Sequence, residues 1–394
     1  MLQDKNFIIF SDDWGRHPFS CQHLMEHFLE AGNRILWVNT IGLRTPRLTV
    51  YDLTRSLQKI TSWLRPLHPE APQEAINLPP NLRVIAPVMI PFNNLPPIRA
   101  FNRSSVVKAV RRAIGEWSNS GWSARASILL ATVPNAADYL GLLGEGLTVY
   151  YCVDDFTLWP GMNQPEMVRS MEETLLARAD LVVTTSQSLQ QSRTRGTIPK
   201  ILSHGVDVAH FSRTPAACPP QMAGLGKPVA GFYGLIDARL DTDLVNALLQ
   251  QHPDWEFVFI GNSLIPLDGL KSFANFHHIQ AVAYQDLPDY AACFDVAILP
   301  YRVNEQTISI NPLKLREYIA TGKPVISTPL PEALALEPAV TTATDAASFA
   351  EAIHNALQND MAPEQRREVL QGETWADKAR LLSHWIATAL KEKP

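Results

Sequence analysis

The fold of this chain is constrained most strongly by short, continuously apolar runs that recur along it with helical stretches between them. In the first half these runs are NFIIF from Asn6, RILWVN from Arg34, LRVIAPV from Leu82, SILLAT from Ser127, LTVYYCV from Leu147 and DLVVTT from Asp180. In the second half they are VAGFYG from Val229, WEFVFIG from Trp255, HIQAVA from His278, DVAILP from Asp295 and KPVIST from Lys323. Strands with continuous rather than alternating hydrophobicity are covered by helices on both faces. The pattern predicts an α/β fold with two tandem, doubly wound Rossmann-like domains.

The domain boundaries are expected where this pattern pauses. A chain of 394 residues is longer than a single hydrophobic core usually supports. The pause follows the turn HGVD at His204–Asp207 and contains the linker-like segment TPAACPPQMAGLGKP. We therefore expect domains over residues 1–205 and 206–372. The segment ETWADKARLLSHWIATAL from Glu373 has the period of an amphipathic helix, so residues 373–394 are expected to close on the N-terminal domain.

Composition places the chain among folded globular proteins, with 46% hydrophobic and 19% charged residues. The start of the sequence, MLQDKNFIIFSDDW, has two acids directly after its apolar run and does not resemble a signal peptide, and no apolar stretch reaches membrane-spanning length. A cytoplasmic location is therefore expected. The cysteines lack C-x-x-C or zinc-ligand spacing, so we predict thiols with neither a disulfide nor a metal role. These cysteines are Cys21, Cys152, Cys218 and Cys293.

The net charge of −5 is unevenly distributed along the chain. Residues 1–205 carry 20 Lys and Arg against 17 Asp and Glu, a balance of +3, whereas the remainder carries −8. Two segments of the first half, Thr54–His68 and Arg99–Trp117, are basic and amphipathic with aromatic residues among the cations. They suit the surface of an anionic membrane, although an ordinary solvated helix face explains them about equally well. Nucleic acid is not an expected partner, because the protein is acidic and no recognised module is present.

A ligand site is expected beyond the carboxyl ends of the strands, where doubly wound sheets bind their ligands. The stretch NPLKLREYIATGKPVIST from Asn311 predicts a helix over Pro312–Thr321, with Asn311 as its N-cap and Gly322 closing it. The N-terminus of such a helix suits an anion. No metal site is predicted.

Several segments together resemble GT-B fold glycosyltransferases that use nucleotide sugars, of the family 4-like type found in bacterial surface polysaccharide and teichuronic acid synthesis. These segments are SDDWGRHPFSCQHL, YYCVDDF, HGVD, GFYGLID, EYIATGKPVIST and TWADKARLL. The resemblance implies an acceptor-binding N-terminal domain, a donor-binding C-terminal domain and an interdomain cleft. It implies a nucleotide-diphosphate sugar as donor, a glycan or lipid-linked glycan as acceptor, and no tightly bound cofactor. A peripheral position on the inner face of the plasma membrane would suit such an acceptor.

The resemblance also assigns roles at the donor site. Glu317 matches a glutamate that usually holds the ribose hydroxyls. The position of the earlier glutamate of the family, which touches the donor sugar, is Ser309 in this register. Glu305 lies four residues before Ser309 and could reach in from a loop.

Charge development on a nucleotide diphosphate leaving group calls for fixed positive groups. Lys314 and Arg239 are the candidate cations, and Asn311 lies at the N-terminus of the predicted helix. For Arg316, which lies on the same helix, a solvated helix face is the preferred interpretation.

The GFYG turn is a further candidate at the donor site, because Gly231 and Gly234 would let backbone approach a phosphate. A simple tight exit from the strand explains these glycines about as well. Asp237 is expected to cap a helix near Leu240.

The candidate catalytic base for transfer to a hydroxyl is Asp155, followed by Asp154, because both acids come directly after a buried strand. The alternative is that one of the two caps the turn that follows.

The acceptor is expected to meet the loop after the first strand. Asp12 and Asp13 form a second acidic pair there, and Trp14 and Arg16 are candidates for acceptor recognition. His17 is a reserve base, although a lone histidine is more often structural.

Two other functions remain open. A sugar-nucleotide epimerase shares this fold, but it needs no acceptor surface. The absent first glutamate would also suit a catalytically silent nucleotide-sugar-binding module.

Overall fold

The computed structural model describes residues 1–15, 19–40, 43, 78–117, 122, 127–215, 217–226, 228–358 and 361–393. The described chain divides into two compact units. Unit 1 consists of Met1–Thr185, Leu189–Leu202 and Ala379–Pro394, and unit 2 consists of Ser186–Ser188 and Ser203–Lys378. The predicted segment Thr54–His68 lies outside the described residues.

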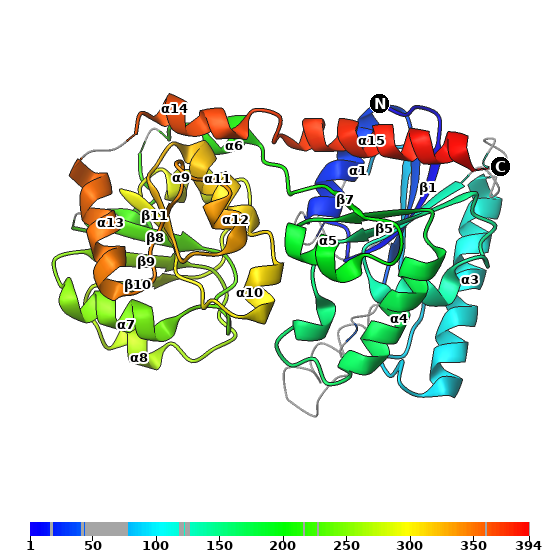
Figure 1. Cartoon of the computed structure of the whole chain (residues 1–394), viewed down its shortest axis with the longest axis horizontal. Coiled ribbons are helices and arrows are strands. Elements are labelled where there is room, and N and C mark those ends of the chain that lie inside the picture. The colour runs from blue at the N-terminus through cyan, green and yellow to red at the C-terminus, as the bar shows by residue number, and fades with distance from the viewer. Residues whose placement is uncertain are drawn as a thin grey trace, which may run out of the picture. The chain divides into compact units, whose positions relative to one another are not determined.

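Unit 1 is built on a seven-stranded sheet with the order β3-β2-β1-β4-β5-β6-β7, and its strand pairs are parallel (Figure 1). Its strands are β1 (Asn6–Ser11), β2 (Arg34–Asn39), β3 (Leu82–Ile85), β4 (Ser127–Ala131), β5 (Leu147–Cys152), β6 (Leu181–Thr184) and β7 (Lys200–Ile201). Every residue of β1, β4 and β5 is buried, as the continuous apolar runs predict. The two-residue strand β7 was not predicted, because its exposed LysIle sequence has no apolar run.

Helices and short 3-10 turns connect the strands of unit 1. They are α1 (Ser20–Glu30), α3 (Pro96–Trp117), η3 (Pro134–Tyr139), η4 (Phe156–Leu158), α4 (Pro165–Arg178) and α5 (Gln187–Arg193), whose first two residues belong to unit 2. In α1 the buried apolar side chains Leu24, Met25 and Phe28 recur at helical spacing and fix the face that meets the sheet.

Unit 2 repeats the same topology, because its sheet order β10-β9-β8-β11-β12-β13 corresponds to the order 3-2-1-4-5-6 of a Rossmann fold. The strands are β8 (Val229–Tyr233), β9 (Glu256–Ile260), β10 (Phe276–Ile279), β11 (Val296–Leu299), β12 (Val325–Ser327) and β13 (Thr341–Thr342). Strand β10 begins two residues before the predicted start at His278, and β13 was not predicted. The prediction of two tandem Rossmann-like domains is confirmed.

The helices of unit 2 are mostly short. They are α6 (Val208–Phe211), η5 (Pro220–Met222), α7 (Thr242–Gln251), α8 (Asp268–Lys271), α9 (Leu287–Ala291), α10 (Glu305–Ser309), α11 (Leu313–Thr321), α12 (Pro331–Leu334), α13 (Ala346–Gln358), α14 (Pro363–Arg367) and η6 (Glu368–Leu370). Helix α11 ends at Gly322, as predicted. The φ of Gly322 is 82°, which lies in the left-handed region that favours glycine. Helix α15 (Trp375–Glu392) begins in unit 2, and its residues from Ala379 onward belong to unit 1.

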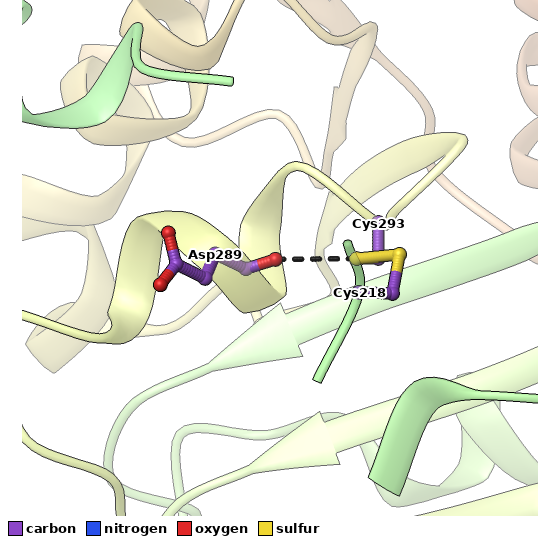
Figure 2. Close-up of a disulfide and its surroundings, with 3 residues drawn as sticks. All are labelled: Cys218, Asp289 and Cys293. Carbon is purple, nitrogen blue, oxygen red and sulfur yellow. Dashed lines mark hydrogen bonds between the residues drawn. A yellow bond between two sulfur atoms is a disulfide. The ribbon is translucent and has the colours of Figure 1, made fainter. Parts of the chain in front are cut away.

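The cysteine prediction is wrong for one pair. Cys218 and Cys293 form a disulfide with a Cα–Cα distance of 5.9 Å (Figure 2). The fold brings them together across a sequence separation of 75 residues, which no local spacing pattern reveals. Cys21 and Cys152 are buried free thiols, as predicted.

Candidate functional site

Two glycines with left-handed backbone stand at the carboxyl ends of neighbouring strands in unit 2. Gly234 follows β8 with φ 121°, and Gly261 follows β9 with φ 143°. A Cβ atom on Gly261 would lie 2.0 Å from the Gly234 carbonyl oxygen, so the two backbones meet with no room for a side chain. Only glycine suits both the space and the torsion angle at these positions.

Lys314 occupies the space that a side chain on Gly234 would need. A Cβ atom on Gly234 would lie 2.1 Å from Lys314 Cε. The half-buried ammonium group donates to the Tyr301 hydroxyl at 3.2 Å and lies 5.7 Å from the centre of the Phe232 ring. No described carboxylate forms an ion pair with it. The first turn of α11 thus places a cation without an ion-pair partner among the described residues beside the glycine edge of the sheet.

Arg239 reaches the same tyrosine from another direction. Its guanidinium lies 5.4 Å from the centre of the Tyr301 ring and is held by Asp237 through bonds of 2.8 to 3.1 Å. The expectation that Asp237 caps a helix is wrong: Asp241 is the N-cap of α7, and Asp237 also accepts from the Arg239 backbone N–H. The physical reason is that Arg239 supplies a charged donor to the carboxylate within the turn.

Gly231 lies inside β8 rather than at its end. A Cβ atom there would lie 2.2 Å from the Phe294 ring, so this glycine makes room for core packing. The expectation that it lets backbone approach a ligand is wrong.

Glu317 lies on α11 with its side chain almost completely buried. Its carboxylate accepts the Tyr233 hydroxyl at 2.9 Å, and the Tyr318 hydroxyl in turn accepts the Tyr233 backbone N–H at 3.0 Å. Burial and the adjacent negative charge of Glu317 raise the pKa of Tyr233 well above its usual value. Tyr233 therefore remains a hydrogen-bond donor that fixes the orientation of this glutamate.

Asn311 does not cap α11, contrary to the prediction. Pro312 holds the N-cap position, and no side chain caps the helix. The Asn311 amide donates to Glu332 at 2.7 Å, and its oxygen accepts from Arg316 at 2.8 Å. The solvated-face interpretation of Arg316 is also wrong, since this side chain is buried and pairs with Glu373 at 2.8 Å. Both residues anchor the helix that carries Lys314.

The segment before α11 contains the short helix α10 instead of a continuous loop. Asn304 caps it and forms a reciprocal capping box with Thr307. Ser309 is buried, and its hydroxyl donates to the Gln306 carbonyl oxygen at 2.7 Å. Glu305 is exposed in the first turn of this helix, not on a loop as predicted.

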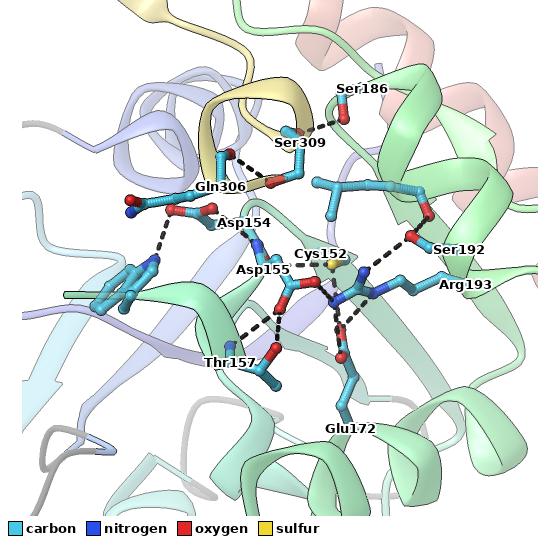
Figure 3. A network of polar contacts seen from close by, with 12 residues as sticks. Cys152, Asp154, Asp155, Thr157, Glu172, Ser186, Ser192, Arg193, Gln306 and Ser309 are labelled. Carbon is cyan, nitrogen blue, oxygen red and sulfur yellow. Dashed lines mark hydrogen bonds and ion pairs between the residues drawn. The ribbon is translucent and has the colours of Figure 1, made fainter. Parts of the chain in front are cut away.

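In unit 1 the acidic pair after β5 is divided between two environments (Figure 3). Asp155 is the N-cap of η4 and accepts from the Thr157 backbone N–H at 3.0 Å, so the capping alternative holds for this residue. Arg193 contacts it at 2.8 Å. Burial opposes ionisation of Asp155, but the bonds from Thr157 and the charge of Arg193 outweigh it and lower its pKa. These contacts weaken Asp155 as a base.

Asp154 accepts from a backbone amide and from an indole. One oxygen accepts the Asp155 backbone N–H at 2.8 Å, and the other accepts the Trp159 indole N–H at 2.6 Å.

Arg193 is the centre of a buried charge cluster that the sequence did not reveal (Figure 3). It pairs with Glu172 at 3.1 Å as well as with Asp155, and Glu172 also accepts the Tyr150 hydroxyl at 2.8 Å. Cys152 Sγ lies 3.4 Å from the same carboxylate, and burial raises the pKa of this thiol well above its usual value. A cavity of about 140 Å³ lies beside the cluster. Glu172 comes from α4 and Arg193 from α5, and neither helix carries a motif.

Side chains of strand β2 hold the loop after β1 in place. The Trp14 backbone N–H donates to Asn39, and the Trp14 ring packs edge-on against Trp37 at 4.9 Å. The Trp37 indole donates to the Asp12 carbonyl oxygen at 2.9 Å. Asp13 is half-buried. The acceptor candidates Arg16 and His17 lie outside the described residues.

Within the described ranges, no group of three or more His, Cys, Asp or Glu side chains is arranged to hold a metal ion.

A comparison with protein families matches residues 238–359 to the model described as "Glycosyl transferases group 1". TuaH of Bacillus subtilis (strain 168), a protein named as a teichuronic acid biosynthesis glycosyltransferase, is 28% identical over 177 residues. The match covers 42% of this chain and 44% of TuaH, so less than half of that relative is represented.

Solved structures match nearly the whole chain. Anabaena Alr3699/HepE in complex with UDP and glucose has a TM-score of 0.65 at 14% identity, and the match covers 98% of this chain and 100% of that one. Sucrose-phosphate synthase from Thermosynechococcus elongatus has a TM-score of 0.69 at 15% identity, with the same coverage.

The two parallel sheets and these matches define the protein as one with the GT-B fold, and the predicted resemblance to GT-B glycosyltransferases is confirmed. The residues that match the group 1 model, 238–359, lie in its second unit.

Proposed function

We propose that unit 2 binds a nucleotide-diphosphate sugar and that the protein transfers the sugar to a glycan or lipid-linked glycan held by unit 1. The observation that carries the proposal is the position of Lys314. A cation without a described ion-pair partner stands on the first turn of a helix and packs against Gly234 at the carboxyl end of β8, where doubly wound sheets bind their ligands. The residues match the chemistry that a diphosphate needs.

Lys314 and Arg239 would act on the leaving group. As the bond from sugar to diphosphate breaks, negative charge accumulates on the diphosphate. Both cations lie at Tyr301, so they would stabilise that charge without moving during the reaction. Since Tyr233 fixes the Glu317 carboxylate, this carboxylate is suited to accept the ribose hydroxyls, the role implied by the family resemblance.

A hollow of about 620 Å³ could receive the nucleobase. It is lined by strand β10 and the residues that follow it, up to Val282. This strand joins Gly261 through the Gly261 N–H, which donates to the Ile279 carbonyl oxygen at 2.9 Å. A nucleotide would then extend from Lys314 past the two glycines toward β10. The volume is typical of small-molecule sites.

For the acceptor we propose Asp154 ahead of Asp155 as the base, because Asp155 is committed to a cap and a buried arginine. Asp13 and Trp14 remain the proposed acceptor contacts. The likeness to TuaH suggests an acceptor of surface polysaccharide synthesis. We propose that this sugar transfer takes place in the cytoplasm or at the inner face of the membrane. No helix among the described residues has both the length and the apolar character needed to cross a bilayer.

Isothermal titration with UDP, GDP, ADP and CMP, without and then with magnesium, tests the donor site. We expect micromolar binding of one diphosphate without metal, weakened about 10- to 100-fold by Lys314→Gln through loss of a charged hydrogen bond. Lys271→Gln, on the exposed end of α8, is the matched control. If no nucleotide binds, or if Lys314→Gln binds as the unmodified protein does, the donor assignment is wrong.

Product analysis with the cognate nucleotide sugar separates the rival functions. Transfer to an added glycan acceptor supports the proposal, and interconversion of the free nucleotide sugar indicates an epimerase. Donor binding with neither product indicates a silent module. Asp154→Asn should stop transfer and leave nucleotide affinity unchanged, and an active Asp154→Asn variant would exclude this base.

A further inference from the structure

Trp159 is an exposed tryptophan near the carboxyl end of strand β5 in unit 1. It follows the 3-10 turn η4 directly. Of the tryptophans that the structure describes, it alone is exposed, with 39% of its surface accessible to solvent. Tryptophan is highly buried on average, and parallel sheets of this kind bind their ligands beyond the carboxyl ends of the strands. An exposed indole ring at this place is therefore a candidate binding surface.

Three contacts hold the indole ring in place. The Trp159 indole N–H donates to Asp154 Oδ2 at 2.6 Å, and the Phe156 ring packs against the indole at 4.9 Å between ring centres. The chain then turns, and the Met162 backbone N–H donates to the Trp159 carbonyl oxygen at 2.9 Å. A proline in the second position of this turn and Gly161 at φ 77° in the third are features of a type II turn. Because the ring is fixed before any ligand binds, the entropy cost of binding is small.

The surroundings of the ring are polar. Within residues 153–164, Trp159 is the only large apolar side chain that is exposed, and Phe156 is buried. A tryptophan N–H lies in the plane of its ring, so the Asp154 carboxylate that accepts it stands at the edge of the ring. The loop therefore presents an isolated aromatic surface with a hydrogen-bond acceptor at its rim.

This combination matches one face of a pyranose ring. A pyranose carries C–H groups on its faces and hydroxyl groups around its rim. The C–H groups pack on the electron-rich face of an aromatic ring, and the hydroxyls donate hydrogen bonds to a carboxylate nearby. A protein partner or a membrane would instead meet a broad apolar patch, which residues 153–164 do not form.

We propose that Trp159 is the stacking platform for a pyranose ring of the acceptor and that Asp154 receives a hydroxyl of that ring. This inference rests on the proposed function. It narrows the acceptor to a molecule that ends in a pyranose, rather than in a bare lipid phosphate or a protein side chain.

The same contact would position the acceptor for transfer. The Trp159 N–H holds the carboxylate that takes the proton of the attacking hydroxyl. The hydroxyl oxygen bonds to the donor sugar carbon, the bond from that carbon to the diphosphate breaks, and the nucleotide leaves with the electron pair. Trp159 thus acts as a positioning residue for both the acceptor ring and the base.

Saturation-transfer NMR on the full chain tests the platform without a donor. The probes are the methyl β-pyranosides of glucose, galactose and N-acetylglucosamine, with open-chain sorbitol for comparison. We expect at least one pyranoside to contact the protein through its ring C–H protons, and sorbitol to show no contact. Trp159→Leu should weaken this binding about tenfold through loss of apolar contact. Trp159→Phe keeps an aromatic face and loses the bond to Asp154, so it should bind more tightly than Trp159→Leu.

A matched control and a transfer assay complete the test. Phe101→Leu removes a ring on α3 that is 48% exposed and should leave pyranoside binding unchanged. In the transfer assay, Trp159→Leu should raise the KM for the acceptor about tenfold and leave the KM for the nucleotide sugar unchanged. The inference is overturned if no pyranoside binds, if sorbitol binds equally well, or if Trp159→Leu binds normally. Equal losses in the Phe and Leu variants also overturn it, because the ring would then act only through its bond to Asp154.

Nucleotide titration of the same variants separates this inference from the proposed function. Both Trp159 variants should bind nucleotide as the unmodified protein does. Pyranoside binding through Trp159 without any nucleotide binding would uphold the platform and refute the donor site. Nucleotide binding together with pyranoside binding that does not depend on Trp159 would overturn the platform alone.

Discussion

Removal of Arg193 should destabilise unit 1 more than any surface substitution. Its guanidinium lies 2.8 Å from Asp155 and 3.1 Å from Glu172, and the side chains of all three are at most 13% exposed. Arg193→Leu leaves two largely buried carboxylates without this cation. Breaking a buried ion pair by removing one partner typically costs about 3 to 5 kcal/mol.

Protonation of a buried carboxylate limits how much stability Arg193→Leu can remove. A carboxylate that has lost its cation can take up a proton instead of remaining charged, at a cost of about 1.4 kcal/mol per pH unit above its ordinary pKa. For a glutamic acid with an ordinary pKa of about 4.3, the cost at pH 7 is about 3.7 kcal/mol. We therefore expect Arg193→Leu to lower the free energy of unfolding by about 3 to 4 kcal/mol at pH 7.

Urea unfolding of the full chain, followed by tryptophan fluorescence, measures this loss in the transition assigned to unit 1. Arg169→Leu is the matched control, because its pair with Glu166 is exposed on both sides. Exposed pairs contribute about 0 to 1 kcal/mol, so the control should unfold almost as the unmodified protein does.

The pH dependence gives a second and independent check. In Arg193→Leu the buried carboxylates should have folded-state pKa values above their unfolded values, so this penalty grows as the pH rises. In the unmodified protein the pKa of Asp155 is lowered, so its contribution is present above about pH 3.9 and is lost only below it. The difference between the two proteins should therefore shrink by about 1.4 kcal/mol per unit from pH 7 toward pH 5. A loss below about 1 kcal/mol at pH 7, or one that does not change with pH, would refute this reasoning.

Three further predictions concern other parts of the molecule. Glu317→Ala should weaken nucleotide binding strongly in a titration, and unchanged affinity would remove its ribose role. Non-reducing peptide mapping should find Cys218 linked to Cys293, and recovery of free thiols at both positions under oxidising conditions would contradict the pairing. Cys218→Ser should lower the free energy of unfolding by up to about 4.5 kcal/mol, the chain-entropy estimate for a loop of this length. Burial raises the pKa of the Cys21 thiol to about 12, so an aromatic disulfide reagent at pH 8 should leave Cys21 unlabelled until urea unfolds the protein.

The fold was largely predictable because both sheets are buried on two faces. Burial of this kind leaves continuous apolar runs such as NFIIF and DVAILP, which are visible without knowledge of the partners. The end of α11 was predictable for a local reason as well, since Gly322 adopts a left-handed conformation that favours glycine. Strands β7 and β13 have only two residues each and carry no such signal.

The polar contacts were harder to predict, because they depend on residues brought together from distant positions. Lys314 could be singled out, since its position at a helix start after a strand is a local property. The partners of Arg193 and Arg316 could not: Glu172 is 21 residues from Arg193, and Glu373 is 57 residues from Arg316. Asp155 shows the same limit, because its sequence position suits a base and a cap equally well.

The division of the chain has a consequence for its synthesis. Helix α15 returns to unit 1 from Ala379 onward, where Leu382 and Ile386 are fully buried, and Ser383 Oγ accepts the Leu2 backbone N–H at 2.6 Å. The helix segment from Ala379 onward, which is translated after unit 2, thus completes a core that begins with β1. Unit 2 can fold as soon as it emerges, whereas unit 1 must wait through the translation of about 180 intervening residues with part of its apolar surface uncovered. The nascent unit 1 is therefore expected to need protection until the segment from Ala379 onward has been made.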